Sequence, residues 1–180
     1  MKIDIFDPGM AGQYSVIYAD PPWSYTQGGH GAATKHYPTM TAAAIKELPV
    51  AQLAAKDAVL FMWATFPNLP QALETIEAWG FKYKTLGFNW VKKSRGGGSL
   101  FWGLGFWTRS NPEVCLLAVK GKPKRVSASV HSVIEAPVQA HSKKPEETRE
   151  RIVQLMGDVP RVELFARQTA DGWDCWGNEV

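Results

Sequence analysis

The sequence predicts an α/β domain in which helices cover a parallel or mixed β-sheet. Short apolar runs alternate with helical patterns along the chain, as expected for strands that helices connect. The apolar runs are nearly continuous, which is typical of strands buried on both faces rather than one. The length of 180 residues is that of one domain with a sizeable core. We therefore expect a single domain over residues 1–180.

Five segments are predicted strands because each is a short apolar run with β-branched or aromatic members. They are Ser15 to Ala19, Ala58 to Ala64, Thr85 to Val91, Glu113 to Val119, and Arg161 to Phe165. Neither an internal repeat nor a compositional break separates them, so they are expected to share one sheet.

Three helices are predicted between the strands. Thr41 can cap the first, over Ala42 to Leu48, and Asn68 can cap the second, which ends before Gly80. The third begins at Pro145, because the fixed φ of proline suits the first turn of a helix.

Two glycine-rich stretches are predicted loops. The first covers residues 27–38, and the second covers residues 94–112 and contains five glycines mixed with aromatic residues. Loops longer than about 12 residues in a compact domain are usually functional or disordered. Disordered segments are poor in aromatic residues, so the second stretch is expected to be a lid or substrate-binding loop.

The formal net charge is +3 at pH 7, which is compatible with a polyanionic partner without requiring one. The cations form two clusters: Lys92, Lys93 and Arg95, and Lys120, Lys122, Lys124 and Arg125. Basic loops that are merely solvated explain these clusters equally well. No apolar run reaches membrane-spanning length, and residues 1–10 lack the pattern of a signal peptide. We therefore expect a cytoplasmic protein without membrane contact.

No metal site is predicted. Two cysteines alone cannot form a disulfide framework or a four-ligand zinc site, and the four histidines show no ligand spacing with a carboxylate or cysteine. His36 and Tyr37 are better explained as contacts to a substrate base or phosphate, with a purely structural role as an equal alternative.

The predicted strand Ser15 to Ala19 is followed directly by Asp20-Pro21-Pro22-Trp23. In open α/β sheets, ligands bind at the carboxyl ends of strands, so this motif is expected in a ligand site. The prolines lack N–H donors, and their carbonyl groups are expected to be free to accept hydrogen bonds. A strand-ending turn with a packed tryptophan is the structural alternative.

These four residues have the properties that methylation of the 6-amino group of adenine requires. That nitrogen is a poor nucleophile because its lone pair is delocalised into the purine ring. The Asp20 carboxylate and the Pro21 carbonyl can accept both of its N–H bonds and favour a pyramidal nitrogen. Stacking on Trp23 would contribute about 1–3 kcal/mol. Alignment and electrostatics would supply most of the remainder, and no metal is required.

Asp20-Pro21-Pro22-Trp23 and several later segments resemble the adenine-N6 methyltransferases related to the seventy-kilodalton catalytic subunit of the eukaryotic messenger-RNA enzyme. The later segments occur in the family's order and cover nearly the whole chain from Tyr14 onward. They are His36-Tyr37-Pro38-Thr39-Met40, Leu60-Phe61-Met62-Trp63, Glu113-Val114-Cys115-Leu116-Leu117-Ala118-Val119-Lys120-Gly121, Lys144-Pro145-Glu146-Glu147, Glu163-Leu164-Phe165-Ala166-Arg167 and Gly177-Asn178.

The resemblance implies a Rossmann-like methyltransferase fold in permuted order, with the catalytic motif near the start and the cofactor strand near the end. It implies S-adenosylmethionine as cofactor and a flipped or single-stranded adenine as acceptor. The residues that would be catalytic are Asp20, Pro21, Pro22 and Trp23. Those that would bind the cofactor are Asp20, Lys144, Leu164, Phe165, Arg167, Asn178 and Glu179.

Physical chemistry agrees with several of these assignments. Phe165 can pack on the cofactor's adenine, Arg167 and Asn178 can bond its ribose hydroxyls, and Lys144 can meet a carboxylate. The alternatives are a core position for Phe165, a surface ion pair for Arg167 and a solvated lysine for Lys144. The chain departs from the family at Ala166, where relatives often carry glycine. This departure bears only on the shape of the local loop.

The substrate contacts are assigned to Tyr25, His36, Tyr37 and Trp107. Trp107 can form a wall of the base pocket, and a position in the core is its equal alternative.

The leading hypothesis is an active adenine-N6 methyltransferase of DNA, of the compact kind that bacteria and their phages carry. Methylation of RNA is one alternative. A catalytically silent nucleic-acid-binding subunit is another, against which the intact Asp20 and Trp23 argue. A methyltransferase for a small molecule or a protein amide would use the same acceptor geometry, but the basic loops weigh against it. A domain this small offers little surface for reading bases, so a homodimer or a partner subunit is a candidate contributor.

Overall fold

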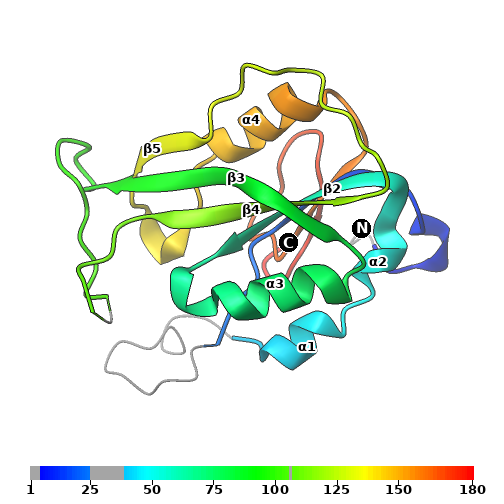
Figure 1. Ribbon diagram of the computed structural model, residues 1–180, viewed down its shortest axis with the longest axis horizontal. Helices are drawn as coiled ribbons and strands as arrows, with labels where there is room; N and C mark the ends of the chain where they lie inside the picture. The colour runs from blue at the N-terminus through cyan, green and yellow to red at the C-terminus, as the bar shows by residue number, and fades with distance from the viewer. Residues whose placement is uncertain (1–4, 25–38, 106) are drawn as a thin grey trace.

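The computed structural model describes residues 5–24, 39–105 and 107–180. Within these residues, seven strands form one sheet in the order β5-β3-β4-β2-β1-β6-β7 (Figure 1). The strands are β1 Tyr14–Ala19, β2 Ala54–Ala64, β3 Lys82–Lys93, β4 Glu113–Lys120, β5 Val133–Pro137, β6 Arg161–Leu164 and β7 Asp174–Trp176. The helices are α1 Ala42–Lys46, α2 Val50–Leu53, α3 Leu69–Ala78 and α4 Glu147–Met156, with 3-10 turns η1 Pro8–Met10, η3 Phe66–Asn68 and η4 Ala140–Ser142.

The directions of the strands bring most of their carboxyl ends to one edge of the sheet. Among the described strands, β4 alone is reversed, because it pairs antiparallel with both β2 and β3 while all other pairs are parallel. The carboxyl ends of the other six strands therefore lie together with the amino end of β4. We call this edge the active edge; Asp20 follows β1 there, and Glu113 begins β4 there. The predicted α/β class with a mostly parallel sheet is confirmed.

The core has two layers, one on each face of the sheet. Alternate residues of β1 and β2 point to opposite layers, so that Ile17 and Leu60 pack with one layer while Val16 and Phe61 pack with the other. The first layer includes residues of α1, α2 and α3, and the second includes residues of α4. Figure 1 shows α1 and α3 on one side of the sheet and α4 on the other. Both faces of the central strands are therefore buried, as their continuous apolar runs predict.

The helix signals were partly correct. Thr41 caps α1 by accepting a hydrogen bond from the Ala44 amide at 3.1 Å. The helix ends at Lys46 rather than Leu48, because a residue before a proline, here Pro49, disfavours the helical conformation. Asn68 precedes α3 but makes no capping bond, since its side chain donates to Thr65 Oγ1 instead.

The third predicted helix, α4, begins at Glu147 and not at Pro145. At its other end Gly157 forms the C-cap with a φ of +82°, a conformation that glycine adopts without strain. No helix among the described residues is both long enough and apolar enough to cross a bilayer.

The sheet departs from prediction at its margins. β5 and β7 were not predicted, because β7 has three half-exposed residues and Ile134 is the single buried residue of β5. Residues Thr85 and Leu86 of β3 are exposed, so burial on both faces was wrong for that part of the strand. The reason is that β5 covers only Asn89 to Lys93, which leaves the first half of β3 at the edge of the sheet.

Candidate active site

A pocket of about 710 Å³ opens at the active edge between the end of β1, the segment before α4, and the β6–β7 connection. Its volume lies within the usual range for small-molecule sites. Seven residues of the sequence-based assignment line it: Asp20, Pro22, Lys144, Phe165, Arg167, Asn178 and Glu179. The parallel neighbours β1 and β6 end side by side, which brings Asp20 and Phe165 to one cavity although the sequence separates them widely.

Lys144, which lines this pocket, lies between two carboxylates. Its Nζ is 2.9 Å from Asp20 Oδ1 and 3.1 Å from Glu113 Oε1. Glu113 is also paired with Lys92, whose Nζ is 2.9 Å from Glu113 Oε2. The side chains of Lys144 and Glu113 are only 10% and 9% exposed. The solvated-lysine alternative for Lys144 is therefore wrong.

Burial and charge act against each other in this cluster. Burial raises the pKa of Asp20 above its ordinary value, Lys144 lowers it, and the carboxylate of Glu113 raises it, so that the net shift is upward. Burial also favours a higher pKa for Glu113, but Lys144 and Lys92 outweigh it and the net shift is downward. Burial alone would lower the pKa of Lys144, yet the two carboxylates raise it. Lys144 is thus a cation held by two acids, and the cluster shifts the pKa values of Asp20 and Glu113 in opposite directions.

The opposite wall of the pocket is aromatic. Phe165 has a φ of +62°, in the left-handed region that glycine prefers, and Ala166 has no such conformation. The strain therefore falls on Phe165 and not on Ala166. Trp176 lies edge-on to Phe165 with ring centroids 5.6 Å apart, and also to Phe6 at 5.1 Å. Trp176 was missed because β7 is too short to produce a strand signal.

A second buried ion pair forms part of the pocket lining. Arg149 of α4 donates to both carboxylate oxygens of Glu163 in β6, over distances of 2.6 and 2.8 Å. Burial raises the pKa of Glu163 in spite of this partner. Neither residue has a predicted role, because an ion pair across 14 positions leaves no local pattern in the sequence. The pair joins α4 to β6 beside the pocket.

The motif residues after Asp20 are more deeply placed than expected. Trp23 is 7% exposed within the core, and its indole N–H donates to the Trp63 carbonyl at 3.1 Å. Its stacking on a base stays a prediction. The expectation of free proline carbonyls was wrong, because Pro21 accepts from the Trp23 amide at 2.8 Å and Pro22 from the Met40 amide at 2.9 Å. A carbonyl oxygen has two lone pairs, so each retains one acceptor position.

Five further assignments are not among the residues that line this pocket. Tyr25, His36 and Tyr37 are outside the described residues. Leu164 is fully buried in the core. Trp107 is 100% exposed, so the core alternative for it is wrong. Among the described residues, no group of three or more His, Cys, Asp or Glu side chains is arranged to hold a metal ion.

The two basic clusters lie at opposite edges. Lys92 and Lys93 end β3 at the active edge, whereas Lys120 ends the reversed strand β4 at the other edge. There Lys120 Nζ donates to the carbonyls of Ala51 and Ala54. Only the first cluster is close to the pocket.

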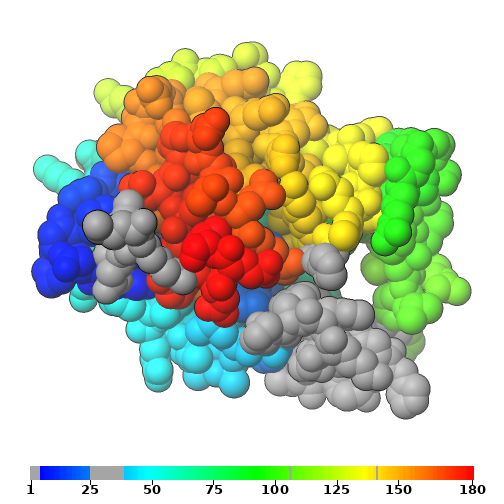
Figure 2. All heavy atoms as spheres, turned by 180° about the vertical axis from the view of Figure 1, so that it is seen from behind, coloured from blue at the N-terminus to red at the C-terminus, as the bar shows by residue number. Residues whose placement is uncertain are grey.

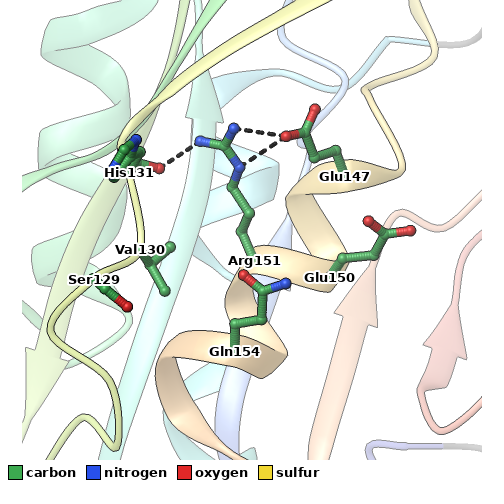
Figure 3. A pocket seen from close by; sticks show the side chains of 7 residues that line it. All are labelled: Ser129, Val130, His131, Glu147, Glu150, Arg151 and Gln154. Carbon is green, nitrogen blue, oxygen red and sulfur yellow. Dashed lines mark hydrogen bonds and ion pairs between the residues drawn. The ribbon is translucent and has the colours of Figure 1, made fainter.

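A smaller pocket of about 290 Å³ lies between α4 and residues 129–131 (Figure 3). Arg151 spans it, pairing with Glu147 at 2.6 Å and donating to the carbonyls of His131 and Val133. Its guanidinium group is already occupied by protein acceptors, and none of the predicted site residues lines this pocket. Arg151 thus connects α4 to the segment before β5. The pocket around it lacks the features of a catalytic site.

The comparisons with known proteins agree with this geometry. The model of the MT-A70 family matches residues 14–179. The chain belongs to the MT-A70 family. The resemblance inferred from the sequence is thereby confirmed, and with it the methyltransferase class of the fold.

Several MT-A70 relatives align over nearly the whole chain. The type II methyltransferase M.MunI of Mycoplasma sp is 32% identical over 191 residues, covering 93% of this chain and 78% of the relative. The N(6)-adenosine-methyltransferase MT-A70-like protein of Arabidopsis thaliana is 30% identical over 179 residues, covering 97% and 25%. The human N(6)-adenosine-methyltransferase catalytic subunit METTL3 is 29% identical over 182 residues, covering 99% and 30%. The chain thus spans most of the first relative and under a third of the other two.

Proposed function

We propose that the protein transfers a methyl group from S-adenosylmethionine to the 6-amino group of adenine in DNA. The observation that carries the proposal is the position of Asp20, which begins the Asp-Pro-Pro-Trp motif, in a cofactor-sized pocket beside Lys144. The names of the relatives support adenine-N6 methylation. DNA is favoured because the chain matches a far larger share of the type II methyltransferase than of the N(6)-adenosine enzymes.

The pocket has the chemical groups that S-adenosylmethionine requires. The aromatic rings of Phe165 and Trp176 suit an adenine base, and Asn178 and Arg167 have polar groups for ribose hydroxyls. Lys144 has a cation for a carboxylate group. When bound, S-adenosylmethionine supplies a methyl group that is electrophilic because a positive sulfonium carries it.

The protein's own groups prepare the acceptor nitrogen. Asp20 accepts one N–H bond of the 6-amino group, and Lys144 holds that carboxylate through contacts to both of its oxygens at 2.9 Å. The remaining lone pair of the Pro21 carbonyl accepts the second N–H bond. Both bonds draw the nitrogen toward pyramidal geometry, which localises its lone pair. Preorganised acceptors in a site with little water act more strongly than the same groups in solution.

Asp20 is also suited to hold the proton that the methylated nitrogen must release. Burial raises the pKa of its carboxyl group, so the carboxylate accepts a proton more readily than an exposed aspartate does. Lys144 stays protonated because both neighbouring carboxylates raise its pKa. The lysine is therefore a fixed positive charge and not the acceptor of this proton.

The test is direct. Purified protein is incubated with labelled S-adenosylmethionine and adenine-containing DNA or RNA oligonucleotides, and the digested products are analysed for 6-methyladenine. We expect label in DNA, and loss of turnover in Asp20→Asn with the fold retained. Asn keeps the shape of Asp20 but has neither the negative charge nor a second acceptor oxygen.

Label in RNA alone would show that RNA, and not DNA, is the substrate. Label in neither polymer, despite measurable cofactor binding, would overturn the proposed activity. Full turnover in Asp20→Asn would refute the role of the carboxylate.

A further inference from the structure

The connection between β3 and β4 presents an unusual amount of apolar surface. We call residues 94–105 and 107–112 the aromatic arm. Figure 2 shows it, in green, standing away from the body of the molecule. Five of its large apolar side chains are exposed: Leu100 by 40%, Phe101 by 38%, Trp102 by 58%, Leu104 by 77% and Trp107 by 100%. Contiguous exposed apolar surface usually marks an interaction site.

The arm is tied to the sheet at its root. Asn111 is 8% exposed, and its amide group bonds both the N–H and the C=O of Lys92 at 3.0 and 2.8 Å. The same side chain donates to the Phe101 carbonyl at 2.6 Å. A backbone bond from Gly103 to Ser110, 2.8 Å long, joins the two sides of the arm. These bonds hold the root in place, so the exposure of Trp102 is a feature of the fold.

The charges of the arm have one sign. Arg95 and Arg109 are exposed, and residues 94–112 contain neither aspartate nor glutamate. Exposed tryptophan beside arginine, without acidic residues, is the composition of a surface that binds single-stranded nucleic acid. Each base has a face on which an aromatic ring can stack, and each phosphate can pair with an arginine.

The root of the arm adjoins the catalytic pocket. Lys92, which Asn111 holds, pairs with Glu113, and Glu113 pairs with the same Lys144 that contacts Asp20. A strand bound along the arm would therefore lie close to Asp20, where the target adenine is proposed to bind.

We propose that the aromatic arm binds the single-stranded nucleotides next to the target adenine, with Trp102 and Trp107 stacking on bases and Arg95 and Arg109 pairing with phosphates. This inference rests on the proposed function. A second copy of the chain fits the arm less well, because a symmetric contact would bring identical patches together, and these carry only cations.

The experiment uses fluorescein-labelled oligothymidine, which contains no adenine and so measures binding outside the site of the target adenine. The double variant Trp102→Leu/Trp107→Leu keeps apolar surface but removes both stacking rings. Fluorescence anisotropy is expected to show affinity about tenfold lower or more, because two bases lose the aromatic rings on which they stack. Tyr83→Leu, an aromatic residue 44% exposed at the opposite edge, is the matched control and should bind normally.

The arginines are tested through salt dependence. For single strands the slope of log affinity against log salt changes by about 0.7 per phosphate contact, so Arg95→Ala/Arg109→Ala should reduce it by about 1.4. The control Lys124→Ala/Arg125→Ala removes two exposed cations at the opposite edge and should leave the slope unchanged.

Unchanged oligothymidine affinity in the double tryptophan variant would overturn the proposal. So would a loss of affinity that accompanies a dimer-to-monomer change in light scattering, because the arm would then be a protein interface. The proposed activity fails separately: a protein that forms no 6-methyladenine but binds oligothymidine through the tryptophans refutes the activity and keeps the arm. If the parent protein methylates DNA normally and the double tryptophan variant binds oligothymidine unchanged, the activity is kept and the role of the arm is refuted.

Discussion

Lys144 determines the charge balance of the site, because it contacts Asp20 and Glu113 at once. Removing one partner of a buried ion pair typically costs about 3–5 kcal/mol, since the other charge stays buried without compensation. We expect Lys144→Met to lower the free energy of unfolding by about this amount in urea denaturation. Because the pKa of Lys144 is raised on folding, the stabilisation is complete below its unfolded pKa and declines only as pH rises through the folded pKa.

The adjacent Lys143 is the control for this substitution. It pairs with Glu146 at the surface, where the two side chains are 33% and 59% exposed. Exposed pairs contribute at most about 1 kcal/mol, so Lys143→Met should unfold nearly as the parent protein does. Equal stability of the two variants would contradict the buried role of Lys144.

The pH dependence of activity follows from Asp20. Turnover requires its carboxylate, and burial raises the pKa of Asp20, so the acid limb of kcat/KM should lie above the ordinary aspartate value of about 3.9. Glu113 contributes to this upward shift through its negative charge. We expect Glu113→Gln to move the acid midpoint to lower pH. Glu135→Gln, which removes an exposed partner of Lys93, should leave the midpoint in place.

These contacts mark the limit of residue-by-residue inference from the sequence. The resemblance singled out Asp20 and Lys144 separately, and the structure adds that they form an ion pair across 124 positions. Glu113 belongs to a recognised segment but had no assigned role. Its proximity depends on the reversal of β4, which places the first residue of that strand at the active edge. No local pattern encodes the direction of a strand.

At the scale of elements, the central strands were predictable and the margins were not. β1, β2 and β4 are buried on both faces and therefore have continuous apolar runs. β5 and β7 cover the edges, where burial is partial and sequence patterns are weak. Because β7 was not predicted, the contribution of Trp176 to the pocket wall was not predicted either.

The close approach of β7 to the end of β6 allows a sharp test. A Cβ atom on Gly177 would lie 2.1 Å from the Ala166 carbonyl oxygen, which is impossible without movement of one wall of the pocket. We expect Gly177→Ala to destabilise the fold by about 1–3 kcal/mol, as overpacking does, and to weaken cofactor binding in calorimetry. Gly98→Ala is the control, because its Cβ would meet nothing within 4 Å. Normal cofactor affinity in Gly177→Ala would show that the wall is not needed.

The whole molecule should respond to its cofactor. A ligand that binds only the folded state at 100 times its Kd stabilises that state by about 2.7 kcal/mol. For a chain of this size we expect S-adenosylmethionine to raise Tm by about 5–10 °C in differential scanning fluorimetry. Asn178→Ala, an exposed residue of the pocket rim, should reduce the rise while leaving the Tm of the free protein unchanged. A parent Tm that does not move would count against this pocket as the cofactor site.

The global arrangement follows from sequence more fully than its details do. Parallel neighbours must end at one edge, and the motifs after β1 and β6 accordingly lie in one pocket. The depth of Trp23 in the core was not predictable, because it depends on the Trp63 carbonyl 40 positions away.

The left-handed backbone at Phe165 has a consequence for engineering. A side chain in this conformation costs about 1–2 kcal/mol that glycine would not incur. Glycine at position 165 would relieve this strain, but it would also remove a ring that packs against Trp176 and lines the pocket. Relaxing the backbone here and keeping the pocket wall are therefore opposing demands on one residue.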